Sequence, residues 1–199
     1  MSRDVVLGRI RAALNGTKPP ANVPRDYRQA FGTADLDLLV DRLVDYRAVV
    51  HRGADVAGTV ADIVPPNATL VVPPGLPEEW LPAGITARPD GDLSAADIAA
   101  ADGVLTGAAV AVAETGTIVL DASPDQGRRI LTLLPDLHIC VLRADQVVAS
   151  VPEAVARLDP RRPLTWISGP SATSDIELNR VEGVHGPRNL HVILVEPPA

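Results

Sequence analysis

The stretch Leu164–Val195, LTWISGPSATSDIELNRVEGVHGPRNLHVILV, places two polar loops between two apolar runs. The first run, Leu164–Ile167, predicts a largely buried strand, and the last, Leu190–Val195, predicts another. Rigid turns are expected between them at Ser168–Ser171 and Gly183–Pro187. Polar loops between buried strands are where α/β proteins present their sites, although Ser, Gly and Pro are also the ordinary composition of loops. The stretch therefore indicates an α/β fold with a candidate site at its strand ends.

The residues between these two turns predict a short helix. Thr173 or Ser174 is a suitable N-cap, and Asp175 and Glu177 would place carboxylates near the helix N-terminus, where the dipole favours them. The same carboxylates with His185 also offer metal-ligand chemistry, but no tight spacing demands a metal, and we expect none.

Helix and strand signals alternate along the rest of the chain with short connections. Helices are expected at 2–14, 35–45, 54–64, 93–101, 128–134 and 151–158, and strands at 46–51, 69–72, 84–88 and 138–142, with two more within 104–120. This alternation predicts an α/β fold with a mostly parallel sheet and helices on both faces. We expect the site loops to meet in a cleft along the carboxyl edge of that single sheet.

The length of 199 residues predicts one domain with an N-terminal appendage. Residues 1–25 are expected to form a helix and a tether that contains Pro19, Pro20 and Pro24. Residues 26–199 are expected to form a single α/β domain.

Composition excludes several classes of function. The net charge is −7 without a long basic run, so no nucleic-acid surface is expected. No signal peptide and no apolar run long enough to span a bilayer are evident, which predicts a cytoplasmic protein. The chain has one lysine, Lys18, and one cysteine, Cys140. Lysine-based catalysis would depend on Lys18 in the tether, and Cys140 by itself cannot hold zinc or an iron–sulfur cluster.

The run Val104–Leu120 contains a single charge, Glu114, in the turn Glu114-Thr115-Gly116. Gly116 suits a hairpin or a bulge between the two apolar halves of the run. Glu114 then lies either in water at a hairpin tip or partly buried beside a partner. Both alternatives are compatible with the sequence.

Arg128 and Arg129 stand at the start of the helix expected at 128–134, where the helix dipole is unfavourable to cations. The placement is easier to understand if one arginine reaches an anion or a carboxylate such as Glu114. A solvated arginine pair is the alternative.

Taken together, these segments resemble the LUD-domain family, and within it the lactate utilization protein C branch. The resemblance covers essentially the whole chain, and the residues that carry it are Ala113-Glu114-Thr115-Gly116-Thr117, the segment LLPDLHICV at 133–141, Ser168-Gly169-Pro170-Ser171 with Thr173, Asp175, Ile176 and Glu177, and Gly183-Val184-His185-Gly186-Pro187.

The resemblance implies a fold similar to the CoA-transferase, ribose-phosphate isomerase and glucosamine-phosphate deaminase group. It also implies a role in oxidising L-lactate to pyruvate, together with partner proteins that carry iron–sulfur clusters. Because this chain lacks clustered cysteines, we expect the redox cofactor on those partners and none in this chain.

The candidate site combines both loops with the Glu114 turn. Backbone amides and hydroxyls of the loops are suited to hold a carboxylate, and His185 titrates near neutral pH, as an acid or base requires. Glu114 would be a base or, by analogy with transferases of that fold group, a nucleophile. The expected catalytic residues are Glu114 and His185, and the expected substrate-binding residues are Thr115, Gly116, Ser168, Gly169, Ser171, Thr173, Asp175 and Gly186. As alternatives, His185 only hydrogen-bonds its own turn, and Asp175 and Glu177 only cap a helix.

The remaining histidines, His51, His138 and His191, lie in or beside strand-like runs and are expected to be structural. Two functions remain open at this point. One is an oxidoreductase subunit without its own redox cofactor that binds a small anionic metabolite. The other is a non-catalytic assembly or regulatory subunit whose N-terminal helix docks a partner.

Overall fold

A computed structural model of the chain describes residues 2–17, 24–25, 27–30, 32–173, 181–182 and 186–196. Its helices are α1 (Arg3–Leu14), α2 (Leu36–Asp45), α3 (Val56–Ile63), α4 (Ala95–Ala99) and α5 (Val151–Arg157), with short 3₁₀ helices η1 (Glu78–Trp80), η2 (Arg129–Thr132) and η3 (Ala144–Gln146). Its strands are β1 (Val49–Arg52), β2 (Thr69–Val72), β3 (Thr86–Pro89), β4 (Gly103–Thr106), β5 (Val110–Val112), β6 (Thr117–Leu120), β7 (Leu137–Arg143), β8 (Val147–Val148), β9 (Thr165–Ile167), β10 (Ala172–Thr173), β11 (Val181–Glu182) and β12 (Asn189–Val195).

The main sheet has six strands in the order β1-β12-β7-β4-β2-β3. Every pair in it is parallel, and the central strands β7 and β12 are the longest at seven residues each. Strands covered on both faces read as continuous apolar runs, as ICVL and LHVIL do here. The predicted α/β class with a mostly parallel sheet is confirmed.

A second sheet of four strands, in the order β8-β5-β6-β9, contains β9, the first strand of the stretch Leu164–Val195. The turn at Gly116 folds β6 back antiparallel to β5, and β9 then pairs antiparallel with β6. The expectation of a single sheet was therefore wrong. Strand β9 is also less buried than expected, because it lies at the edge of this sheet, where Trp166 is 43% exposed.

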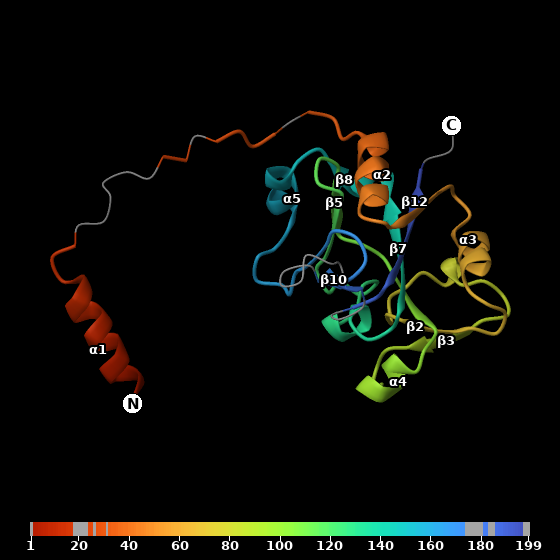
Figure 1. Cartoon of the computed structure of the whole chain (residues 1–199), viewed down its shortest axis with the longest axis horizontal. Coiled ribbons are helices and arrows are strands. Elements are labelled where there is room, and N and C mark those ends of the chain that lie inside the picture. Colours follow the sequence, from red (N-terminus) through yellow and green to blue (C-terminus); the bar gives the residue numbers. More distant parts are fainter. Residues whose placement is uncertain are drawn as a thin grey trace.

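Both faces of the main sheet are covered, as β7 shows by alternation. Its Ile139 and Val141 pack in one cluster with Val56 and Val60 of α3. Its Cys140 and Leu142 point the other way, into a cluster with α2 and the second sheet. Figure 1 shows α2 and α3 on opposite sides of β12 and β7. Helices therefore lie on both faces, and one face also supports the second sheet.

Helix α2 packs against both sheets and lies close to the turns at Gly116 and Gly169. Asp35 caps it by accepting hydrogen bonds from the amides of Asp37 and Leu38. At its other end, a methyl group on Gly116 would lie 2.6 Å from the Cβ of Arg42, and one on Gly169 would lie 2.6 Å from the Cβ of Tyr46. Glycine at both turns therefore allows the helix to approach both loops closely.

One local expectation differs from the structure. The helix expected at 128–134 is a short 3₁₀ turn, η2. Thr173, one of the two expected caps, lies in strand β10, which pairs antiparallel with β11, with Thr173 opposite Val181. The helix expected after Thr173 falls on residues 174–180, which lie outside the described residues, as does the turn at 183–185.

Helix α1 buries none of its residues, and Figure 1 draws it apart from the rest of the chain. Its apolar side chains Val5, Val6, Ile10 and Leu14 are between 42% and 58% exposed. Within the described part of the chain, no helix is long and apolar enough to cross a membrane.

Candidate functional site

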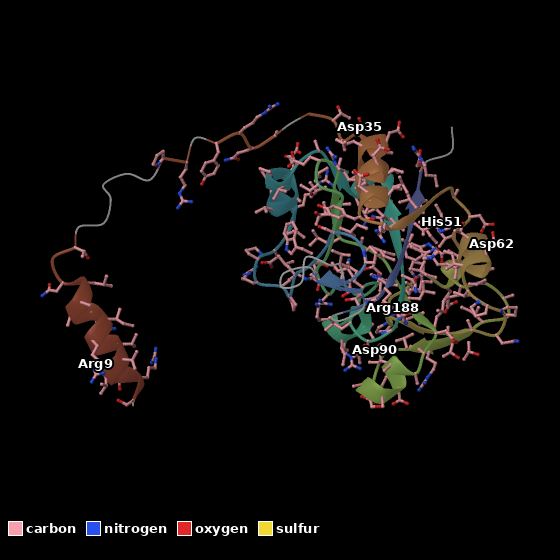
Figure 2. The ribbon with its side chains drawn as sticks, viewed as in Figure 1. Arg9, Asp35, His51, Asp62, Asp90 and Arg188 are labelled. Carbon is pink, nitrogen blue, oxygen red and sulfur yellow. The ribbon has the colours of Figure 1, made fainter. Side chains whose placement is uncertain are left out.

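A cavity of about 240 Å³ opens at the amino ends of β7 and β12, between the main sheet and the end of β9. Arg188, the residue before β12, marks this end of the sheet in Figure 2, and α4 lies towards the same end. The cavity is lined by Arg129, Thr132, His138, Trp166, Ile167, Ser168, Gly169, Pro170, Ser171, Gly186, Pro187 and Leu190.

The two loops predicted to form a site do meet here. The Ser171 amide donates a hydrogen bond to the Pro187 carbonyl over 2.8 Å. A methyl group on Gly186 would lie 3.4 Å from the Cβ of Ser171, so these two loops are in contact. Four of the predicted binding residues, Ser168, Gly169, Ser171 and Gly186, line the cavity.

The cavity is not at the carboxyl edge of the sheet, where we expected it. His138 and Leu190, which lie in its wall, are each the second residue of their strand and are paired in register. The reason is the second sheet: β9 runs antiparallel to β6 and delivers Ser168 to the amino ends of β7 and β12.

Glu114 does not line this cavity. Its carboxylate accepts a hydrogen bond from the Val151 amide over 3.0 Å, and its own amide donates to the Ala149 carbonyl. Glu114 therefore stands at the N-terminus of α5, where a carboxylate satisfies a free amide and the helix dipole favours negative charge. The hairpin-turn position was correctly predicted, but its side chain is exposed and bonded to a helix outside the cavity.

Thr115 and Thr117 connect the Glu114 turn to the cavity through Ser168. The Thr115 hydroxyl donates to the Thr117 hydroxyl over 2.9 Å, and the hydroxyls of Thr117 and Ser168 are 2.8 Å apart. With the Thr117 proton directed to Ser168, the Ser168 proton is free to point into the cavity. Thr115 and Gly116, both predicted to bind substrate, thus lie behind Ser168 and not in the cavity wall.

Arg129 is the positive charge of the cavity. Its guanidinium donates to the Thr132 hydroxyl over 2.8 Å, and within the described ranges no carboxylate lies within 4.0 Å of it. Desolvation lowers the pKa of Arg129 below its ordinary value, and no acidic group offsets that effect. Its neighbour Arg128 is different, because it makes a bidentate pair with Asp90, whose side chain is 5% exposed.

His138 forms the deep wall of the cavity and is 1% exposed. Its Nε2 lies 2.8 Å from the Oγ1 of Thr106. Burial, and then the nearby charge of Arg129, lower the pKa of His138 to about 4, so that the ring is neutral at physiological pH.

Three predicted site residues cannot be placed in this cavity. His185 and Asp175 lie outside the described residues, and of Thr173 only the backbone position in β10 is given. Among the residues that the structure describes, no group of three or more His, Cys, Asp or Glu side chains is arranged to hold a metal ion.

Sequence reasoning missed two important cavity residues. The pair Arg128-Arg129 at an expected helix start indicated an anionic partner for one arginine. The sequence did not show which of the two lines the cavity. His138 carried none, because the run HICVL reads as core. Ser168, which was expected in the site from its turn, lines the cavity.

The chain is an α/β protein whose cavity lies between a parallel sheet and a smaller mixed sheet. One arginine, several hydroxyls and a buried neutral imidazole line this cavity. The chain belongs to the LUD domain family, as the resemblance in its motifs suggested. A sequence model of that family, described as "LUD domain", matches residues 78–195.

Individual relatives agree with this assignment. Lactate utilization protein C of Deinococcus radiodurans is 47% identical over 198 residues, which cover 96% of this chain and 93% of that protein. Lactate utilization protein C of Bacillus pumilus is 38% identical over 93 residues, or 43% of this chain and 38% of that protein. The crystal structure of a DUF162 family protein from Deinococcus radiodurans superimposes with a TM-score of 0.70 at 44% identity, covering 80% of this chain and 95% of that one.

Proposed function

We propose that this chain is a component of an L-lactate utilization system that oxidises lactate to pyruvate, and that its cavity binds a small anionic metabolite of that pathway. The observation that carries the proposal is Arg129, a guanidinium that lines a cavity without a carboxylate partner among the described residues. A partly desolvated cation of this kind favours an anion, because the anion restores the interaction that water no longer supplies.

The other cavity groups fit a small carboxylate. Ser168 offers a hydroxyl proton, and Ser171 and Gly186 bring the second loop within reach. The volume of about 240 Å³ lies below the range of about 300–1,000 Å³ typical of larger ligands. The names of the relatives, lactate utilization protein C, support lactate metabolism as the setting.

Electron transfer is assigned to partner proteins. We propose that iron–sulfur lactate utilization proteins act with this chain and hold the redox cofactor. The one cysteine, Cys140, is buried, and burial raises the pKa of its thiol to about 12, which is unfavourable for a metal-ligating thiolate. The chain would then act as a cytoplasmic subunit that binds the metabolite.

The direct test of the cavity is calorimetry and thermal shift with short carboxylates. Arg129→Gln is expected to weaken binding about 10- to 100-fold, as the loss of a charge-assisted hydrogen bond does. Arg161→Gln is the matched control, because Arg161 is 88% exposed and pairs only with Asp159 on the surface. Failure of every short carboxylate to bind or stabilise the wild-type chain would refute the binding proposal.

A second function is favoured by a separate observation. Helix α1 exposes an apolar stripe that nothing in the described residues covers, as expected of a helix that joins an assembly. On this alternative the chain is a non-catalytic assembly or regulatory subunit. Reconstitution with the iron–sulfur partners separates the two: loss of lactate oxidation in Arg129→Gln with the assembly intact supports metabolite binding, whereas unchanged turnover supports assembly.

A further inference from the structure

A second cavity, of about 300 Å³, lies at the other end of β7, where β4 and β7 have their carboxyl ends. We call it the carboxyl-edge cavity. Open parallel sheets bind their ligands beyond the carboxyl ends of their strands. The segment after β4, the loop after β6, the residues from the end of β7 to η3 and the end of α5 line this cavity, and most of their side chains are polar. Its lining is therefore suited to a polar ligand.

The loop after β6 provides an aspartate without a cationic partner. Asp121 of this loop pairs with Arg162 over 3.3 Å, but Asp125 pairs with no arginine or histidine of the described residues. The Asp125 carboxylate is partly buried and lies directly over Gly107, where an added methyl group would collide with it. Burial raises the pKa of Asp125, which is the direction expected of a carboxylate that lacks a cation. This wall of the cavity therefore carries an excess of one negative charge.

On the other wall, two arginines share one aspartate. The Nε of Arg143 lies 3.2 Å from the Asp145 carboxylate, and Arg157 donates to the Asp145 carbonyl over 3.1 Å. Arg157 has no carboxylate partner in the part of the chain that the structure describes. This wall therefore carries an excess of one positive charge.

The segment after β4 connects the two walls. The Gly107 amide donates to the Asp125 carbonyl over 2.8 Å. The Gln146 side chain donates to the Ala108 carbonyl and accepts from the Arg143 amide over 2.9 Å. The unpaired aspartate and the two arginines thus border one space without pairing with each other. A ligand that satisfies both walls needs a cationic end and an anionic end.

We propose that the carboxyl-edge cavity binds a small α-amino acid as its zwitterion, with the ammonium group on Asp125 and the carboxylate on Arg143 and Arg157. A charge-assisted hydrogen bond then forms at each end of the ligand. A partly desolvated charge favours such a partner, because water no longer solvates it fully. This site is separate from the cavity that Arg129 lines, and it does not depend on the proposed function.

The Ser123 hydroxyl indicates the kind of side chain that the amino acid carries. Ser123 lines the same cavity, and no described residue forms a hydrogen bond with its hydroxyl group. The volume of about 300 Å³ is at the lower end of the range of about 300–1,000 Å³ for ligand sites. A short side chain with a hydroxyl or amide group, as in L-serine or L-asparagine, is therefore favoured.

The test compares L-serine with two molecules that each lack one of its charges. 3-Hydroxypropionate lacks the ammonium group, and ethanolamine lacks the carboxylate. Binding to the wild-type chain is measured at neutral pH by calorimetry, with NMR titration for the weaker ligands. We expect L-serine to bind about tenfold or more tightly than either, since each of the others forgoes a charge-assisted hydrogen bond.

The variants then assign each end of the ligand. Asp125→Asn keeps the shape of the side chain and is expected to weaken L-serine binding about 10- to 100-fold while leaving 3-hydroxypropionate unchanged. Arg157→Gln is expected to weaken L-serine and 3-hydroxypropionate and to leave ethanolamine unchanged. Asp62→Asn is the matched control, because Asp62 is exposed on α3, which contributes no residue to this cavity. Thermal unfolding verifies that each variant is folded.

Two results would overturn the inference. One is equal affinity of the wild type for L-serine and 3-hydroxypropionate, and the other is absence of binding for L-serine, L-asparagine and glycine alike. Arg129→Gln is expected to keep its L-serine affinity, and a loss there would place the amino acid in the other cavity and also overturn the inference. Carboxylate binding at Arg129 is measured separately, so failure of this inference leaves the proposed function standing.

Discussion

Substitution of Gly169 by alanine tests whether the close approach of α2 shapes the candidate site. Gly169 has φ +90°, a conformation that costs a residue with a Cβ about 1–2 kcal/mol. The new methyl group would also lie 2.6 Å from the Cβ and 2.9 Å from the carbonyl oxygen of Tyr46. Because a backbone oxygen cannot rotate away, α2 or the loop must move, and such overpacking costs about 1–3 kcal/mol.

Gly84→Ala is the control for this prediction. Gly84 has nearly the same conformation, φ +86°, but nothing lies within 4 Å of the position of its Cβ. The two variants therefore share the cost of the backbone conformation, and their difference isolates the contact with Tyr46. We expect Gly169→Ala to be less stable than Gly84→Ala by about 1–3 kcal/mol.

The assay is chemical and thermal unfolding of both variants beside the wild type. For a chain of this length, 1 kcal/mol corresponds to about 2–4 °C, so the Tm of Gly169→Ala should lie about 2–12 °C below that of Gly84→Ala. Because Gly169 lines the cavity, carboxylate affinity should fall in Gly169→Ala and not in Gly84→Ala. Equal losses of stability in the two variants would show that α2 does not pack on this loop and would refute the reasoning.

Three further predictions follow from single side chains. The pKa of His138 is lowered from 6.5 to about 4. Between these pH values the unfolded chain binds a proton at His138 and the folded chain does not, so the stability of the fold decreases as the pH drops from 6.5 to 4. The loss of stability is about 3 kcal/mol, and His138→Gln should flatten that part of the pH profile of urea unfolding. The pKa of His191 is also lowered, by burial and then by His51, so His191 lowers stability with falling pH in both the wild type and the variant. Glu114→Gln should lower stability by less than about 1 kcal/mol, as the loss of a charge at a helix N-terminus does. Its carboxylate affinity in calorimetry should be unchanged. Weaker carboxylate binding by the folded variant would show that Glu114 contributes to the site. Cys140 is buried with its pKa raised to about 12, so a thiol reagent should label it only in denaturant, and rapid labelling of the native chain would contradict its position in the core.

Much of the secondary structure could be predicted from local signals. Strand 69–72 was predicted to the residue. The helix expected at 93–101 is shorter than predicted, and it begins with a capping box in which Ser94 and Asp97 satisfy each other's backbone amides. At Glu114-Thr115-Gly116 the sequence allowed a hairpin or a bulge, and the structure has the hairpin. These features depend on apolar periodicity and on the backbone preferences of a few neighbouring residues, which are contained in a short window of sequence.

The site could be predicted only in part. The loop Ser168–Ser171 was identified because glycine and proline interrupt an apolar run, and Gly186 because it belongs to a second such turn. Glu114 was expected beside them because it is the only charge in its run, yet its carboxylate is bonded to the amide of Val151, a residue distant in sequence. No local pattern shows which distant amide a carboxylate will reach.

The sequence by itself determined the family, the α/β class and the positions of most strands and turns, because each of these depends on residue order within a segment. Only the tertiary structure decided that β9 joins β6 in a second sheet, that Arg128 pairs with Asp90 while Arg129 faces a cavity, and that His138 lines that cavity. These outcomes depend on which strand edge and which charged groups remain unpaired once the whole chain has packed, and contacts between residues far apart in sequence determine them.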